Sequence, residues 1–188
     1  MKKTVLTFGL IGGAIMAAMM FATLPFVEKI GFDKGEIVGY TTMILAFMLV
    51  FFGIRSYREN VSGGRITFGR AFAVGILITL VACVCYVVAW EILYFKFMPD
   101  FVDKYASYMV EKVRTSGASQ QVIDAKLQEM KSFKAMYDNP FINAAITFTE
   151  PFPIGLIVTL ISAAILRKRT TAATRDEGSA QLPVQQEN

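Results

Sequence analysis

The chain of 188 residues contains no histidine, only two cysteines and one tryptophan, and 18% of its residues are charged. Without histidine it cannot form a Ser-His-Asp triad or a histidine-ligated metal or haem site. The cysteines, Cys83 and Cys85, would point to different sides of a helix, so we expect no disulfide between them. The low charge and the 54% of apolar residues exclude a disordered chain and argue against a soluble enzyme.

Four long apolar runs dominate the sequence. They cover residues 4–27, 37–54, 71–90 and 141–166, with 24, 18, 20 and 26 residues, and only the last contains a charge, Glu150. At about 1.5 Å per residue, each run can cross a hydrocarbon layer about 30 Å thick as a helix, the second with help from its flanks. The pattern therefore predicts an all-α fold, an integral membrane four-helix bundle. The first run is too long for a signal peptide, and no clear cleavage site follows it, although a cleaved leader would leave three spans.

Basic residues are concentrated in three segments. Lys2 and Lys3 precede the first run, and Arg167, Lys168 and Arg169 follow the last. The segment between the second and third runs has four arginines against one acid, and its members are Arg55, Arg58, Arg65, Arg70 and Glu59. In a four-span protein these segments share one side, and basic excess marks the cytoplasmic side. We therefore expect both termini in the cytoplasm. This role accounts for the arginines, and binding of anionic lipid headgroups is the alternative.

Small residues recur every four positions in the predicted spans. The rows are Gly9, Gly13 and Ala17; Gly35 and Gly39; and Ala71, Gly75, Thr79 and Cys83. Such rows allow helices to approach closely in lipid. They predict contacts within one bundle, with a homo-oligomer or an unidentified membrane partner as the alternative.

Residues 97–140 form the longest segment between apolar runs. Asp100 and Ser119 are candidate helix caps, Gly117 is a candidate helix end, and apolar residues recur at helical spacing on both sides of it. The segment predicts an extracytoplasmic amphipathic helical hairpin that packs on itself and on the bundle, or presents a face to lipid or a partner. We assign residues 1–169 to the membrane domain and 170–188 to a disordered cytoplasmic tail.

Three acids come to a similar height near the outer edge of the predicted membrane. Counted from the basic residues of each span, Glu36, Glu91 and Glu150 lie about 28, 31 and 25 Å away. Pro151 and Pro153 remove backbone donors and predict a kink or a new helix start beside Glu150. The acids form either an outward-facing polar vestibule for a cation or protons, or ordinary interfacial side chains at a bent helix end.

Several stretches resemble a known family. They are GFDKGEIVGYTTMILAFMLVFFGIRSYREN at 31–60, RITFGRAFAVGILITL at 65–80, YFKFMPDFVDKYASYMVEK at 94–112 and EPFPIGLIVTLISAAILRK at 150–168. Over about residues 3–169 the chain resembles a bacterial four-span family known only as domain of unknown function four-one-nine-nine. The resemblance implies an integral protein of the bacterial inner membrane. It lends no site residue and no activity.

We predict a non-enzymatic component of the lipid bilayer that acts through helix packing or partner contact. A small transporter or channel-like protein with an acidic vestibule is the alternative. An enzyme using Glu91 or Glu150 would need a second positioned group, which the sequence does not identify. No cofactor, metal or nucleic acid is predicted.

Overall fold

The structure is a computed structural model that describes residues 1–168. The predicted disordered tail, 170–188, lies outside the described residues. The elements are α1 (Lys2–Thr23), the 3-10 turn η1 (Leu24–Phe26), α2 (Val27–Ile30), α3 (Phe32–Asn60), α4 (Phe68–Ile92), the π-helical turn η2 (Leu93–Phe97), α5 (Phe101–Thr115), α6 (Gln120–Tyr137), α7 (Pro140–Phe148) and α8 (Pro151–Leu166). Residues 1–168 contain helices and no strand, so the all-α prediction is confirmed.

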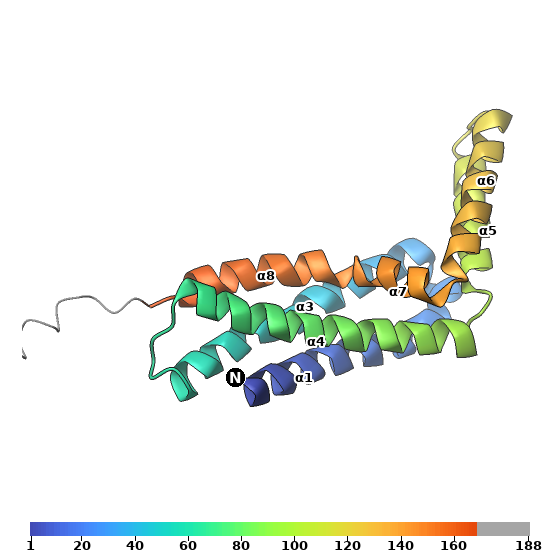
Figure 1. The fold of residues 1–188 in the computed structure, drawn as a ribbon. Coiled ribbons are helices and arrows are strands. Elements are labelled where there is room, and N and C mark those ends of the chain that lie inside the picture. The colour runs from blue at the N-terminus through green and yellow to red at the C-terminus, as the bar shows by residue number, and fades with distance from the viewer. Residues whose placement is uncertain (169–188) are drawn as a thin grey trace, which may run out of the picture.

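The long helices run side by side as one bundle, and the hairpin of α5 and α6 projects sideways from one end of it (Figure 1). The N-terminus, the α3–α4 loop and the end of α8 lie at the opposite end. Four stretches are long and apolar enough to cross a membrane: Lys2–Ile30, Phe32–Asn60, Phe68–Phe97 and Pro140–Leu166. The first three extend several residues past the apolar runs that predicted them, while the fourth adds only Pro140 to its run.

Turns between the spans occur where the backbone requires them. Pro25 lies in the 3-10 turn that follows α1, and Gly31 adopts a φ of 92°, a conformation that favours glycine. This corner turns the chain into α3. The last apolar run is interrupted, since α7 ends at Phe148 and α8 begins at Pro151. Asn139 caps α7, with its side chain accepting hydrogen bonds from the backbone N–H groups of Phe141 and Ile142.

Several of the glycines noted in the sequence lie at contacts inside this bundle. A Cβ added at Gly9 would come within 2.7 Å of Val81, and one at Gly75 within 2.8 Å of both Ile54 and Thr159. The helices therefore approach each other closely at these positions. Gly39 differs, because a Cβ there meets no atom within 4 Å. Its place in the small-residue row does not correspond to a helix contact.

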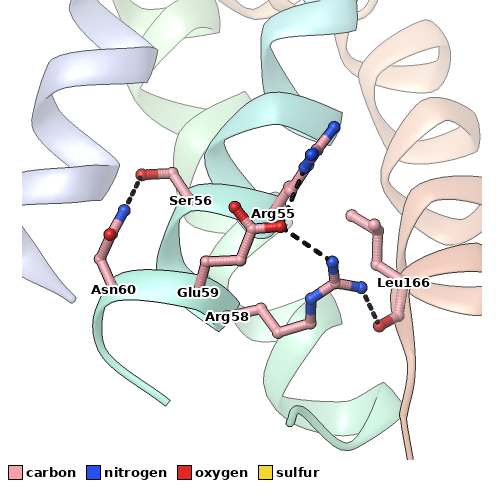
Figure 2. A network of polar contacts seen from close by, with 6 residues as sticks. All are labelled: Arg55, Ser56, Arg58, Glu59, Asn60 and Leu166. Carbon is pink, nitrogen blue, oxygen red and sulfur yellow. Dashed lines mark hydrogen bonds and ion pairs between the residues drawn. The ribbon is translucent and has the colours of Figure 1, made fainter. Parts of the chain in front are cut away.

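The basic end of the bundle is held by arginine side chains. Arg58 donates a hydrogen bond to the carbonyl oxygen of Leu166 at 3.3 Å and lies 3.1 Å from a carboxylate oxygen of Glu59, which also pairs with Arg55 (Figure 2). Arg70 donates to the hydroxyl of Tyr57 at 2.9 Å. These bonds join α3 to the end of α8 and to the start of α4. Arg58 and Arg70 therefore have packing roles in addition to their predicted role in orientation.

The hairpin packs on itself along α5 and α6 around Val110, Ile123 and Met130, which are buried. Leu127 of α6, one of the apolar residues at helical spacing in this segment, is 42% exposed and is not part of this cluster. Asp100 and Ser119 precede the two helices, but neither side chain caps its helix. Asp100 instead forms an ion pair with Lys104 at 2.8 Å.

Candidate functional site

A partly open cavity of about 360 Å³ lies at the hairpin end of the bundle, lined by α1, α3, α4 and the base of the α5–α6 hairpin. We call it the hairpin-end cavity. Its walls combine aromatic rings, methionine side chains and two carboxylates. The residues used below are Met16, Met20, Glu36, Gly39, Tyr40, Tyr86, Trp90, Tyr105 and Glu150. A cavity of this size and composition is typical of a small-molecule site.

The two carboxylates reach the cavity from different elements. Glu36 stands in the first turns of α3, one helical turn before Tyr40. Glu150 stands at the junction of α7 and α8, where the prolines interrupt the helix. The hydroxyl of Tyr86 on α4 donates a hydrogen bond to Glu150 Oε2 at 2.9 Å. The helix break thus places a carboxylate in the cavity wall, and α4 fixes its direction.

Glu91, the third acid of the predicted cluster, is not brought into this cavity. Its neighbour Trp90 lines the wall, and successive residues of a helix differ in direction by about 100°. One carboxylate oxygen of Glu91 is buried and has no hydrogen-bond partner within residues 1–168. The structure therefore brings together Glu36 and Glu150 and separates Glu91 from them.

A buried polar network supports the wall around Trp90. The Trp90 Nε1–H group donates to Asn143 Oδ1 at 2.8 Å, and the Asn143 amide donates to the carbonyl oxygen of Tyr137 at 3.1 Å. The Thr147 hydroxyl donates to Asn143 Oδ1 at 3.1 Å and lies 3.3 Å from the Tyr137 hydroxyl. Burial raises the pKa of Tyr137 to about 12, so its phenol stays protonated at neutral pH. The network joins α4, α6 and α7.

The base of the hairpin closes the cavity. Phe101 and Tyr105 of α5 line it and pack edge-on against Phe32, with ring centroids 6.0 and 5.6 Å apart. Phe101 also packs edge-on against Trp90 at 5.1 Å. Through these rings, α5 packs against α3 and α4 and forms one side of the cavity.

Ion pairs hold α5 against the corner between α2 and α3. Lys104 lies 2.6 Å from Glu28, and Lys112 lies 2.8 Å from Asp33. Hydrogen bonds to these and neighbouring carboxylates raise the pKa of both lysines, and the hydrogen bond from Lys104 lowers the pKa of Asp100. Their contribution to docking is therefore present at neutral pH. It is lost when the pH rises through the raised lysine pKa values, because a neutral lysine no longer pairs with Glu28 or Asp33.

No lysine or arginine lines the hairpin-end cavity in the part of the chain that the structure describes. The nearby hairpin lysines are paired with other carboxylates, and Lys134 pairs with Asp103 at 2.7 Å. The cavity wall therefore carries two acids and no base. Within residues 1–168, no group of three or more acidic, cysteine or histidine side chains could hold a metal ion.

The aromatic members of the site and the network behind them were not predicted from the sequence. Tyr86 and Trp90 are four residues apart, as are Glu36 and Tyr40, so each pair shares a helix face. Asn143 and Thr147 repeat this spacing within an apolar run. These polar and amphipathic pairs were the available signal. Their uncharged members were overlooked because they stand within the long apolar runs.

Comparison with protein families matches residues 7–168 to the family described as "Protein of unknown function (DUF4199)". This is the family that the sequence resembles, and the match covers all four membrane-spanning candidates almost completely. Comparison with curated proteins and comparison with solved structures gave no match. The chain belongs to the DUF4199 family.

Proposed function

We propose that this protein binds a small molecule in the hairpin-end cavity, as a small transporter or receptor-like membrane component would. The observation that carries the proposal is a cavity of about 360 Å³ whose wall holds Glu36 and Glu150 among aromatic rings. A bundle that served only as a packing element would gain nothing from such a space, since cavities weaken packing. The vestibule is therefore favoured over a purely structural role.

The proposal includes an orientation. We place the protein in the bacterial cytoplasmic membrane with both termini inside and the hairpin outside. The support is the gathering of basic residues from the N-terminus, the α3–α4 loop and the end of α8 at the end of the bundle opposite the hairpin. In this orientation the cavity lies near the outer surface, where a ligand from outside the cell can reach it.

We propose binding rather than catalysis. The described part of the cavity wall supplies carboxylates, phenols and thioethers, but no cysteine, lysine or histidine to act as nucleophile or as a base poised near neutral pH. Tyr86 already donates its proton to a hydrogen bond with Glu150. This pair can orient a ligand without reacting with it.

A second candidate is the accessory role, in which the protein acts through a partner. It is favoured by two exposed aromatic residues at the base of the hairpin, Phe97 and Phe141, which are 68% and 85% exposed. Large exposed apolar side chains suit a partner surface or a lipid interface equally well. A stoichiometric companion that copurifies from gently solubilised membranes would favour this second role.

Filling the cavity tests the proposed binding. In Gly39→Leu, the new side chain starts from a position where a Cβ meets no atom within 4 Å, so it should occupy the cavity without disturbing the fold. We expect ligands that raise the melting temperature of the purified parent protein in a small-molecule screen to lose that effect in Gly39→Leu.

Gly69→Leu is the matched control. Gly69 is also a helical glycine, and an added Cβ there meets no atom of residues 1–168 within 4 Å, but it lies at the start of α4 and does not line the cavity. Gly69→Leu should retain every ligand-induced shift. A Gly39→Leu protein that is stabilised by the same ligands to the same extent would contradict binding in this cavity.

A further inference from the structure

The wall of the hairpin-end cavity has a composition that selects among ligands. The two acidic side chains, Glu36 and Glu150, reach it from different elements, while the rings of Tyr40, Tyr86 and Trp90 supply flat apolar surface. Electron-rich ring faces attract a cation that is close and poorly hydrated, and methionine sulfur adapts to irregular apolar groups. The carboxylates and the ring faces therefore both favour a positively charged ligand.

The surrounding basic side chains do not neutralise the negative charge of Glu36 and Glu150. The hairpin lysines that could neutralise the acids are engaged with Glu28, Asp33 and Asp103, outside the cavity wall. Among the described side chains, only the neutral phenol of Tyr86 donates a hydrogen bond to Glu150. An anion would meet two like charges with no base among the described wall residues, and it would bind poorly.

The size and polarity of the cavity further restrict the class of ligand that it can bind. A bare metal ion prefers several oxygen ligands at about 2.0–2.6 Å, and within residues 1–168 no cluster of that kind is present. A space of about 360 Å³ lined by rings and methionines instead fits an organic molecule that carries apolar groups. A fully neutral apolar molecule would bring no positive charge to the two carboxylates.

We infer that the hairpin-end cavity is a site for an organic ammonium ion that carries aromatic or aliphatic groups. This inference rests on the proposed function and specifies its ligand class. The ammonium group lies between the carboxylates of Glu36 and Glu150 and against the aromatic rings. Its apolar groups extend toward Met16 and Met20 on α1.

Trp90 provides the measurement, because it is the single tryptophan of the chain and it lines the cavity. Its emission in protein purified in a non-ionic maltoside detergent is titrated with benzyltrimethylammonium, with the uncharged isostere neopentylbenzene and with the anion phenylmethanesulfonate. We expect a saturable change with the cation, binding weaker by at least about tenfold for the neutral isostere, and no saturable change with the anion.

Charge-neutral variants assign the selectivity to the two acids. Glu36→Gln and Glu150→Gln should each weaken binding of the cation severalfold, and the double variant should remove the preference over neopentylbenzene. Gln at position 150 retains an acceptor for Tyr86, so the wall should keep its shape. Glu91→Gln is the matched control. It removes a carboxylate at the same end of the bundle but outside the cavity wall, and it should leave affinity within about twofold.

The results of these titrations distinguish failure of the ammonium inference from failure of the proposed binding function. Equal affinity for the cation and its neutral isostere, or unchanged cation affinity in the double variant, would overturn the ammonium inference while leaving the cavity as a binding site. Tighter binding of the anion would also overturn it. If none of the probes changes Trp90 emission and no ligand stabilises the protein in the small-molecule screen, both the inference and the proposed function fail.

Discussion

Replacement of Asn143 by leucine should lower the free energy of unfolding by about 2–3 kcal/mol. Asn143 is fully buried, and its amide bonds to the Trp90 ring N–H, the Tyr137 carbonyl and the Thr147 hydroxyl. Leucine has a similar size but leaves the Trp90 donor and the Tyr137 acceptor without partners. A buried group that loses its partner costs about 1–3 kcal/mol, although interhelical hydrogen bonds in membranes average only about 0.6 kcal/mol.

The measurement is unfolding of the purified protein by titration with a denaturing detergent. Asn60→Leu is the matched control, since Asn60 is exposed and bonds only to Ser56 at 3.2 Å, and its replacement should change stability by less than about 0.5 kcal/mol. Trp90→Phe should lower the free energy of unfolding by less in the Asn143→Leu protein than in the parent, because Asn143, the hydrogen-bond partner of Trp90, is already absent. An Asn143→Leu protein as stable as Asn60→Leu would show that the network is not structural.

Replacement of Gly155 by alanine should destabilise the bundle by about 1–3 kcal/mol. A Cβ at this position would come into contact with Thr79 of α4 and would lie 2.8 Å from the Phe47 ring of α3. The Thr79 hydroxyl donates to the Gly155 carbonyl oxygen at 3.4 Å and lies 3.1 Å from the Thr159 hydroxyl. A methyl group therefore has to push α8 away from both neighbouring helices and weaken these bonds.

The same unfolding titration compares Gly155→Ala with Gly69→Ala. Both changes replace a helical glycine and should gain up to about 1 kcal/mol from helix propensity. An added Cβ at Gly69 meets no atom within 4 Å, so that variant should be neutral or more stable than the parent. Equal stability of the two variants would mean that α8 does not pack closely at Gly155.

The sequence predicted the bundle well because its signal is local. A run of apolar residues without charge is sufficient to identify a spanning helix, and the two prolines beside Glu150 indicated the interruption between α7 and α8. Helix ends were less predictable, since α3 begins at Phe32, five residues before its apolar run. Polar residues continue a helix as readily as apolar ones once it has started.

The site could not be predicted from the sequence alone, because the height of a residue along a span does not say which direction its side chain takes. Glu36, Glu91 and Glu150 were grouped because their distances from the basic residues are similar, but the rotational position of Glu91 on α4 directs it away from the cavity. The closure by α5 depends on Phe32 meeting Phe101 and Tyr105, far apart in sequence. Spacing within one helix can identify a shared face, but not the helix that this face meets.

The most direct test of the account asks whether the cavity opens to the outside and holds the cation. In a background with Cys83→Ala and Cys85→Ala, Gly39→Cys places a thiol in the cavity wall without removing a ring of the site, and Val61→Cys places one at the opposite end of the bundle. Within the described residues a Cβ at Gly39 meets no atom within 4 Å, and Val61 is 54% exposed. A membrane-impermeant maleimide is added to spheroplasts with and without benzyltrimethylammonium.

We expect that Gly39→Cys reacts in intact spheroplasts, that saturating benzyltrimethylammonium slows this reaction severalfold, and that Val61→Cys reacts only after the membrane is opened. Labelling of Val61→Cys rather than Gly39→Cys in intact spheroplasts would contradict the orientation. A Gly39→Cys reaction that the cation leaves unchanged would contradict a cation site in the hairpin-end cavity.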